Sequence, residues 1–320
     1  MRRTLFVNAM IMACAMVSQS VVSAAEIENI TRPTAMAGQF YPGDPTKLAA
    51  EVDKYLAQAK DTPIPTDSRL VALVCPHAGY PYSAPVAAWS YRLLAQVKSS
   101  VDLVIIVGSS HHSAFKGASL GNYKAWRTPL GDLEVDADLV RKLLKENDFL
   151  SNNPTPHLQE HCLETQLPFV KKILPDAKIV PILIGYLNKD VAKRLAAALS
   201  GVLDQRKAVI IFSTDLSHYL PYEKAVAVDK KSTDGIASAP ADEFYAKVND
   251  EKFSMCGASA IAVLKYLQEL RKNDDGEITP VAMLKYMNSG DTAGDKNRVV
   301  GYAAMALFEK RGGARPQPNQ

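Results

Sequence analysis

The chain contains 6 histidines, and four of them closely follow runs of apolar residues: His77, His111, His112 and His218. Imidazole is a common ligand of transition metals and a general acid or base near neutral pH. Each apolar run is predicted to be a buried strand, and the ends of parallel strands converge on one edge of a sheet. Taken singly, each histidine is more readily a hydrogen-bonded loop residue. Their common placement predicts one shared metal or acid–base site.

A further ligand candidate is Cys256, in the segment Ser254-Met255-Cys256-Gly257 at the start of a predicted helix. The helix dipole lowers the pKa of a thiol at this position, and a thiolate favours softer metals. Two histidines and one thiolate would leave coordination positions open for water, O₂ or substrate. The alternative is a small apolar side chain packed at a helix start, because no CxxC or HxxxH spacing enforces proximity.

Two carboxylates lie near these histidines in the sequence. Asp215 precedes His218 by three residues in a loop, a spacing that allows the carboxylate to orient the imidazole for acid–base work. Asp215 could equally be a turn or helix-capping residue, as its Ser and Thr neighbours allow. Glu164, three residues after His161, is either a hydrogen-bonding partner of a ligand or a solvated surface residue.

The elements that must position these residues are strands alternating with helices. Apolar runs predict strands at Leu70–Cys75, Val101–Val107, Lys178–Ile184 and Ala208–Phe212, and Pro181 indicates an edge or a bulge in the third. A helix predicted over Pro85–Val97, with the proline in its first turn, joins the first two strands in a right-handed crossover. The pattern predicts an α/β fold with a central, mostly parallel or mixed sheet flanked by helices.

Additional elements complete this prediction. Helices are expected at 46–60, 136–146, Lys189–Leu203, Tyr222–Ile236, Ala241–Val248 and Cys256–Arg271, and late strands at Val281–Met287 and Val299–Phe308. No internal repeat or interdomain linker interrupts the series, which predicts a single domain over residues 25–310. Residues 311–320 are rich in Gly, Pro and Gln and are predicted to be disordered.

The first 24 residues are predicted to be a signal peptide. Two arginines precede an apolar stretch from Leu5 to Val17, and Val22-Ser23-Ala24 forms a small-residue cleavage site. An uncleaved anchor is the competing interpretation, but the apolar run is shorter than the roughly 20 residues of a span. Ile11–Cys14 only faintly resembles a lipoprotein box, which leaves lipidation at Cys14 open. We therefore expect an exported, periplasmic protein without a membrane span in the mature chain.

Composition argues against nucleic acid as a partner. The 37 basic residues are nearly balanced by 34 acidic ones, and no basic stripe with interleaved aromatic residues occurs. Without Cys14, the cysteines are Cys75, Cys162 and Cys256. An odd number leaves at least one thiol unpaired in the monomer, while a Cys75–Cys162 disulfide stays open.

Seven ordered motifs closely resemble those of the Memo-like family, whose bacterial members are called AmmeMemoRadiSam system protein B. They extend through most of the predicted mature chain, which makes the resemblance far more specific than any single motif. The motifs are Ala37-Gly38-Gln39-Phe40-Tyr41, Pro76-His77-Ala78-Gly79-Tyr80, Gly108-Ser109-Ser110-His111-His112, Arg127-Thr128-Pro129-Leu130-Gly131, His161-Cys162-Leu163-Glu164 with Leu167-Pro168, Ser213-Thr214-Asp215-Leu216-Ser217-His218, and Cys256-Gly257.

The resemblance implies a fold like that of class III extradiol dioxygenases, with a central mixed sheet and a deep metal-site cleft. It implies metal ligands at His77, His111 and Cys256, where the dioxygenases use a carboxylate in place of the thiolate. It also implies an acid–base histidine at His218 with Asp215 beside it. Iron and copper are the metals linked to the family, and radical-SAM partners are suggested by the family's name alone.

The chain departs from the family pattern in two places. Gln166 stands where some relatives have a second histidine after the glutamate, which weakens a ligand role at this position. The signal peptide is unusual for a family that is regarded as cytosolic. Export would put the site where copper is accessible and where Cys256 can be oxidised.

Three functions compete at this stage. The leading hypothesis is a mononuclear Fe(II) or copper site of two histidines and one cysteine, with redox or dioxygenase-like activity on an unknown small molecule. The second is a non-catalytic module that uses the same cleft to hold a peptide or to carry copper. A zinc hydrolase is a weaker third hypothesis, because no glutamate stands beside the strand-end histidines to act as the base.

Overall fold

Four apolar segments form the parallel centre of the main sheet. The structure is a computed structural model, and it describes residues 29–250, 252–272 and 276–310. They lie in the order β2 (Ser68–Cys75), β9 (Ala208–Ser213), β3 (Leu103–Ser109) and β8 (Lys178–Ile184), and neighbouring members of this series pair in parallel. Nearly every side chain of these strands is buried. Helices that cover both faces of the sheet explain why these runs are continuously apolar.

Antiparallel strands extend the sheet at both ends, so the sheet is mixed. Beside β2 lies β12 (Val299–Lys310), which also pairs with β10 (His218–Leu220) and β11 (Ala282–Asn288). Beyond β8 lie β4 (Ala118–Ser119) and β7 (Leu150–Ser151). A small separate sheet contains β1 (Thr31–Arg32), β5 (Ala125–Trp126) and β6 (Leu133–Glu134). The predicted α/β fold with a mixed sheet is confirmed.

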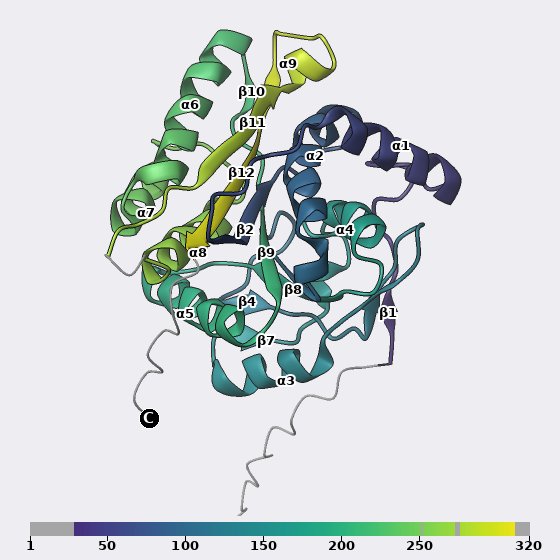
Figure 1. Ribbon diagram of the computed structural model, residues 1–320, viewed down its shortest axis with the longest axis vertical. Coiled ribbons are helices and arrows are strands. Elements are labelled where there is room, and N and C mark those ends of the chain that lie inside the picture. The colour runs from purple at the N-terminus through teal and green to yellow at the C-terminus, as the bar shows by residue number, and fades with distance from the viewer. Residues whose placement is uncertain (1–28, 251, 273–275, 311–320) are drawn as a thin grey trace, which may run out of the picture.

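Helices pack on both faces of the sheet (Figure 1). One group contains α1 (Pro45–Gln58), α2 (Tyr80–Gln96) and α4 (Leu167–Ile173). The other contains α5 (Lys189–Gln205), α6 (Tyr222–Ser238), α7 (Ala241–Asn249) and α8 (Ala258–Leu270). The shorter α3 (Ala137–Glu146) and α9 (Ser289–Thr292) and three short 3₁₀ turns, Lys98–Ser100, Thr155–His157 and Glu164–Gln166, complete the described helices.

The prediction for the second helix was wrong at its start. Helix α2 begins at Tyr80, with Pro81 in its first turn, and Pro85 lies inside the helix. The earlier start is fixed by the backbone, because the amide of Tyr80 donates a hydrogen bond to the carbonyl of Phe40. Sequence periodicity could not reveal this contact, since it comes from a loop 40 residues upstream of the helix.

Pro181 lies in β8, where it faces Ile106 of β3. On the other side of β8, the short strand β4 pairs only with Leu183 and Ile184. The ladder on this side therefore ends before it reaches Pro181, which agrees with the expectation that a proline lies where a strand has a free edge.

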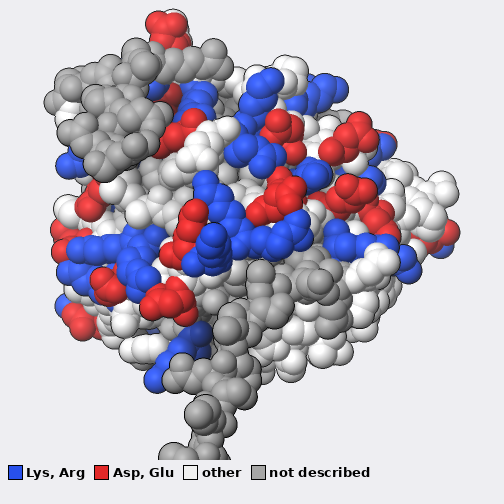
Figure 2. All heavy atoms as spheres, turned by 90° about the horizontal axis from the view of Figure 1, so that it is seen from below, with Lys and Arg blue, Asp and Glu red and all other residues white. Residues whose placement is uncertain are grey.

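Several sequence predictions fall partly or wholly outside the described residues: the signal peptide over residues 1–24, Cys14 and the tail over residues 311–320. Within the described residues, no helix combines the length and the apolar character needed to cross a membrane. Cys75, Cys162 and Cys256 are all free thiols in the structure. On the face drawn in Figure 2, basic and acidic side chains are interspersed, in keeping with their similar numbers in the sequence.

Candidate metal centre

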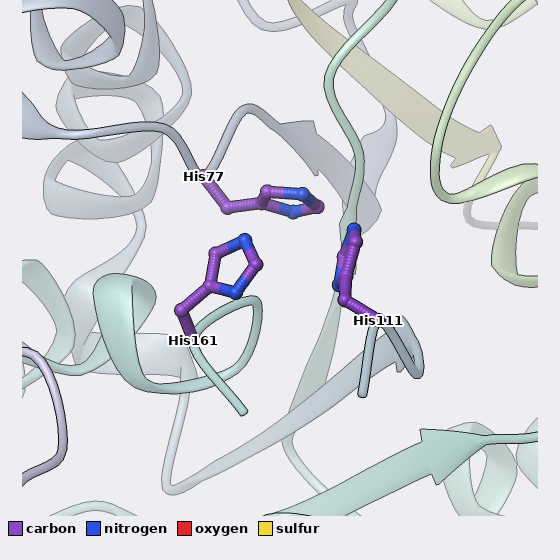
Figure 3. Close-up of side chains that lie close together, drawn as sticks. All are labelled: His77, His111 and His161. Carbon is purple, nitrogen blue, oxygen red and sulfur yellow. The ribbon is translucent and has the colours of Figure 1, made fainter. Parts of the chain in front are cut away.

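Three imidazoles lie together at the carboxyl edge of the parallel strands (Figure 3). His77 follows β2, His111 follows β3, and His161 precedes the turn that leads into α4. Each contributes one potential ligand atom, and these three atoms lie within 4.8 Å of one another. The strand ends thus gather two of the predicted ligands, and a loop adds a third imidazole.

His77 is held in one tautomer by its surroundings. Its Nδ1 lies 2.8 Å from the hydroxyl oxygen of Ser213. This hydroxyl donates its hydrogen to the carbonyl of Cys162 at 2.6 Å and accepts from the amide of Gln166 at 2.9 Å. Because the hydrogen of Ser213 is already used, Nδ1 of His77 must be the donor, and Nε2 carries the free lone pair.

Gln166 therefore supports His77 through Ser213. Its amide also donates to the carbonyl of Pro76, and its side-chain oxygen accepts from the hydroxyl of Tyr91. The residue is almost fully buried. Gln166, the residue that departs from the family pattern, therefore fixes the loop that carries His77.

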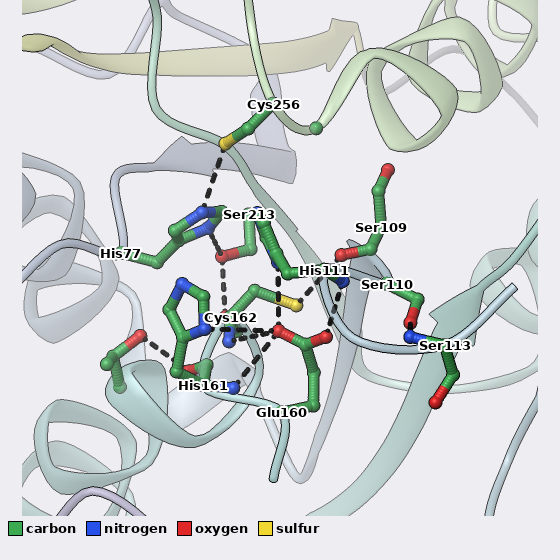
Figure 4. A network of polar contacts seen from close by, with 12 residues as sticks. His77, Ser109, Ser110, His111, Ser113, Glu160, His161, Cys162, Ser213 and Cys256 are labelled. Carbon is green, nitrogen blue, oxygen red and sulfur yellow. Dashed lines mark hydrogen bonds and ion pairs between the residues drawn. The ribbon is translucent and has the colours of Figure 1, made fainter. Parts of the chain in front are cut away.

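His111 is oriented by the buried carboxylate of Glu160 (Figure 4). Its Nδ1 lies 2.9 Å from Oε1 of Glu160, and its backbone amide donates to Oε2 at 2.7 Å. The side chain of Glu160 has no solvent exposure. Although burial acts to raise the pKa of Glu160, hydrogen bonds from His111 hold it well below its ordinary value. An ionised Glu160 makes Nδ1 of His111 the protonated nitrogen and leaves Nε2 free.

His161 has the same partner. Its Nδ1 lies 3.3 Å from Oε1 of Glu160, and its backbone amide donates to the same oxygen at 3.0 Å. The ring packs against Phe40, His77 and His111. We predicted neither His161 nor Glu160 as part of the site, because both lie in a polar loop away from any strand end. The adjacent Glu-His pair was the one signal in the sequence.

Two imidazoles of this cluster, those of His77 and His161, favour their neutral form. Burial is the main cause that lowers the pKa of His77 to about 3, and nearby His111 adds to the effect. Burial likewise lowers the pKa of His161 to about 3, with further contributions from His77 and His111. A neutral imidazole is the form that binds a metal.

The sulfur of Cys256 lies 3.1 Å from Nε2 of His77. The amides of Asp215 and Gly257 fix this region, the first donating to the sulfur at 3.2 Å and the second to the hydroxyl of Thr214 at 2.8 Å. A Cβ atom at Gly257 would come within 2.5 Å of the Ser213 carbonyl, so only glycine allows this approach. Burial raises the pKa of the Cys256 thiol to about 12, contrary to the lowering expected from a helix dipole, so without a metal the thiol donates to His77.

Cys256 is closer to His77 than to the rest of the cluster. Among the described residues, none of the groups of three ligand atoms within 4.8 Å of one another includes Cys256. Typical bond lengths of about 2.3 Å to sulfur and 2.0 Å to nitrogen place two ligands of one tetrahedral ion roughly 3.5 Å apart. The 3.1 Å between Cys256 and His77 is near this value.

Asp215 connects the His77 loop to the Cys256 loop. Its Oδ1 accepts from the backbone amide of His77 at 2.7 Å, and its carbonyl accepts from the amide of Cys256 at 3.2 Å. Burial raises the pKa of Asp215 to about 6, against the hydrogen bond from His77 that lowers it. The carboxylate of Asp215 thus positions the backbone of His77. From the sequence, we had expected this carboxylate to orient the imidazole of His218.

His218 lies at the start of β10 and is exposed. Its Nδ1 lies 2.8 Å from the carbonyl of Leu216, so Nδ1 is the donor and Nε2 is free to accept a proton. The next residue, Tyr219, has a φ of 61°. A bulky side chain rarely adopts this left-handed conformation, and such strain is concentrated at functional sites.

The remaining histidines differ in their surroundings. His112 is exposed, with its ring 5.9 Å from that of His161. His157 is fully buried away from the cluster, next to Trp126, and its Nε2 contacts the hydroxyl of Ser119. His112 lies at the rim of the cluster, with a ligand atom within 4.8 Å of those of Glu160 and His161, whereas His157 belongs to the protein core.

Glu164 is neither a partner of a ligand nor a surface residue. It is fully buried and forms an ion pair with Arg32 at 2.6 Å. It also accepts from the amides of Ala35 and Met36 and from the hydroxyl of Tyr41. Both interpretations of Glu164 from the sequence are wrong, because its partners come from a segment about 130 residues away.

The donor set fits a transition metal. Three imidazoles each have one nitrogen in contact with a hydroxyl or a carboxylate, which leaves the other nitrogen for a metal, and a thiol stands beside one of them. Hydrogen bonding of the second ring nitrogen is typical of histidines that bind metals. Imidazole with thiolate suits iron, copper and zinc, so the donors alone do not select one of these metals.

Comparisons with known proteins agree with the motifs. A family model described as Memo-like protein matches residues 32–306. A MEMO1 family protein of Desulfurococcus amylolyticus is 34% identical over 286 residues, which cover 87% of this chain and 99% of the relative. A second, from Methanopyrus kandleri, is 33% identical and covers 86% of this chain and 98% of the relative.

Among solved structures, the crystal structure of an uncharacterized protein from Escherichia coli K12 is similar to this chain. The two share 14% sequence identity with a TM-score of 0.45, and the alignment covers 74% of this chain and 99% of that protein.

Proposed function

Because this chain belongs to the family of Memo-like proteins, we propose that it is a mononuclear metal-binding protein with redox or dioxygenase-like activity. The residues that would hold the metal are His77 and His111, as the family resemblance implies, with Cys256 and His161 as further donors. Iron(II) and copper are the proposed metals, and zinc is the less favoured one. The observation that supports this proposal is the convergence of three imidazole ligand atoms within 4.8 Å.

A bound metal of this kind supplies a position at which substrate and O₂ can meet. The chain itself supplies the acid–base chemistry. Nε2 of His218 is free, because Nδ1 is turned toward the carbonyl of Leu216, so this nitrogen can take a proton from a substrate hydroxyl and later return it. Asp215 contributes by holding the backbone of His77.

The experiment is metal analysis of protein purified without oxygen, followed by O₂ uptake with a panel of catechols. We expect about one metal ion per chain in the wild type. We expect almost complete loss of the metal in His77→Ala and His111→Ala, because each removes one of the three clustered imidazoles. Equal metal content in these variants and in the wild type would overturn the ligand assignment.

The third donor is decided by two more variants. Cys256→Ser should lose metal if the thiolate is a ligand, and His161→Ala should lose metal if the third imidazole is one. His112→Ala is the control, because its ring lies 5.9 Å from that of His161, farther than the rings of His77 and His111. Its metal content should equal that of the wild type.

A second candidate is a non-catalytic copper carrier or a peptide-binding module that uses the same site. The observation that favours copper is the contact of a thiol with an imidazole at 3.1 Å, since thiolate ligands select copper(I). Copper bound without O₂ uptake would support this function, and iron with uptake would support the first.

We also propose that the chain is exported to the periplasm, on the basis of its first 24 residues. Cell fractionation with an antibody, together with mass determination of the purified N-terminus, tests this proposal. Full-length protein in the cytoplasm would contradict it.

A further inference from the structure

We propose that Glu160 is a positioning residue that sets the tautomers of two imidazoles, His111 and His161, at the same time. This inference rests on the proposed metal-binding function, and it concerns how the protein prepares the site before a metal arrives. It assigns to one buried carboxylate the alignment of two ligands that come from different loops.

The argument begins with the contacts of the two carboxylate oxygens. Oε1 lies 2.9 Å from Nδ1 of His111 and 3.3 Å from Nδ1 of His161. The same oxygen accepts from the backbone amides of His161 and Cys162 at 3.0 and 3.1 Å. Oε2 accepts from the backbone amide of His111 at 2.7 Å. Every neighbour in this set is a nitrogen that can donate.

This arrangement determines what Glu160 can do. Nδ1 of His111 is hydrogen-bonded to Oε1 and must carry a hydrogen, because a carboxylate only accepts. Nδ1 of His161 faces the same oxygen at 3.3 Å, which favours a hydrogen on this nitrogen too, because two lone pairs would otherwise face each other. Their Nε2 atoms then carry the lone pairs. Carboxylate–histidine contacts of this kind fix the tautomer and ring orientation of metal ligands, and their loss typically weakens metal affinity by roughly 10- to 100-fold.

The alternative is that Glu160 itself binds the metal, since its oxygens lie near His111 and His161. The side chain is fully buried, and both oxygens already accept hydrogen bonds. Binding a metal would require several of these donors to be left unpaired in the interior, which is costly. The contacts therefore favour an orienting role.

The chain offers a matched control in Glu164. It is as deeply buried as Glu160, it lies four residues later at the start of the 3₁₀ turn Glu164–Gln166, and it also accepts several hydrogen bonds. Its partners belong to the segment from Arg32 to Tyr41. Glu164→Gln should therefore reproduce the general cost of neutralising a buried glutamate without changing the imidazoles of the site.

The first test needs no metal. Nitrogen-15 NMR of the imidazoles in the metal-free wild type should show His111 and His161 in the Nδ1–H form. In Glu160→Gln, one oxygen is replaced by an NH₂ group that cannot accept, so both populations should move toward the Nε2–H form. His77 should stay unchanged, because Ser213 fixes it independently. Glu164→Gln should change none of the three.

The second test uses cobalt(II) as a spectroscopic probe in competition with a chelator. We expect the affinity to fall roughly 10- to 100-fold in Glu160→Gln and to stay near that of the wild type in Glu164→Gln. A wild type with His111 in the Nε2–H form would overturn the inference. It would also be overturned if Glu160→Gln left the tautomers unchanged, or if Glu164→Gln changed them as much as Glu160→Gln does. A wild type that binds no metal would overturn the proposed function, and the tautomers would still decide the inference.

Discussion

Glu160 and Glu164 are the same residue type, they lie four positions apart, and both are fully buried. The difference lies in the segments that meet them. Glu160 faces the loops that carry His111 and His161, whereas Glu164 faces Arg32 and the segment that precedes α1. The first carboxylate prepares a set of ligands, and the second attaches the N-terminal part of the described chain to the body of the protein.

The comparison shows that burial of a charge does not by itself indicate chemistry. A buried carboxylate surrounded by backbone amides and a guanidinium is a structural anchor. A buried carboxylate whose donors include two ring nitrogens controls which nitrogen of each ring is free. The identity of the donors therefore separates the two roles.

The largest change in stability is expected when the ion pair between Glu164 and Arg32 is broken. Glu164→Gln leaves the charge of Arg32 buried without its partner, which should lower the free energy of unfolding by roughly 3–5 kcal/mol. Urea denaturation of the metal-free protein measures this loss. The double variant Arg32→Met/Glu164→Gln should lose less than the sum of the two single losses, because both disrupt one interaction. Additive losses would show that the pair is not coupled.

Acid sensitivity is expected to be the next largest effect, and the two regions should share it. Burial is the main cause that lowers the pKa values of His77, His157 and His161 to about 3. Each takes up a proton on unfolding, so its contribution to stability is complete above pH 6.5 or so and is lost as the pH falls toward 3. Asp215, with its pKa raised to about 6, acts in the opposite direction below that pH.

Between pH 7.5 and 6.0 the histidines dominate. The free energy of unfolding of the metal-free protein should fall by about 2 kcal/mol over this range. His157→Asn, at the residue whose carbonyl accepts from Arg32, and His161→Asn, beside Glu160, should each remove about a third of the histidine contribution. Urea denaturation at the two pH values measures the change. If only His161→Asn reduced the pH dependence of the free energy of unfolding, His157 would not contribute to acid sensitivity, contrary to our expectation.

The smallest effect on stability is expected at His218, whose side chain contacts neither glutamate. The residue is exposed, and the hydrogen bond of its ring goes to the carbonyl of Leu216. His218→Ala should change the free energy of unfolding by no more than about 0.5 kcal/mol and should retain its metal. Turnover of a substrate with an ionisable hydroxyl should be lost. Loss of metal in this variant would place His218 among the ligands instead.

The fold could be predicted from the sequence where burial leaves a continuous apolar signal. Val101–Val107 and Ala208–Phe212 are close to β3 and β9, because strands covered on both faces contain almost no polar residue. The start of α2 could not be predicted, because it depends on a contact with Phe40. The order of strands was likewise hidden, since pairing such as that of β2 with β12 is decided between distant segments.

In the candidate site too, residues that follow a local pattern could be predicted, and residues that depend on distant contacts could not. His77 and His111 could be anticipated, since both come directly after apolar strands. His161 and Glu160 were missed, because a loop without periodicity gives no sign of where it packs. Glu164 was misread for the same reason: its burial depends on Arg32, which lies 132 residues earlier. Local patterns report which face is buried but not which partner covers a charge.

The position of β12 has a consequence for the order of events during biosynthesis. This last described strand lies against β2, which leads to His77, and its Gly301 exchanges backbone hydrogen bonds with Leu216 and Ser217, just before His218. His77 and Cys256 are themselves 179 residues apart. Until β12 has been synthesised, β2 and the segment at Leu216 and Ser217 lack the support of this strand, and long-range pairing of this kind forms late. Metal acquisition should therefore follow the synthesis and pairing of β12.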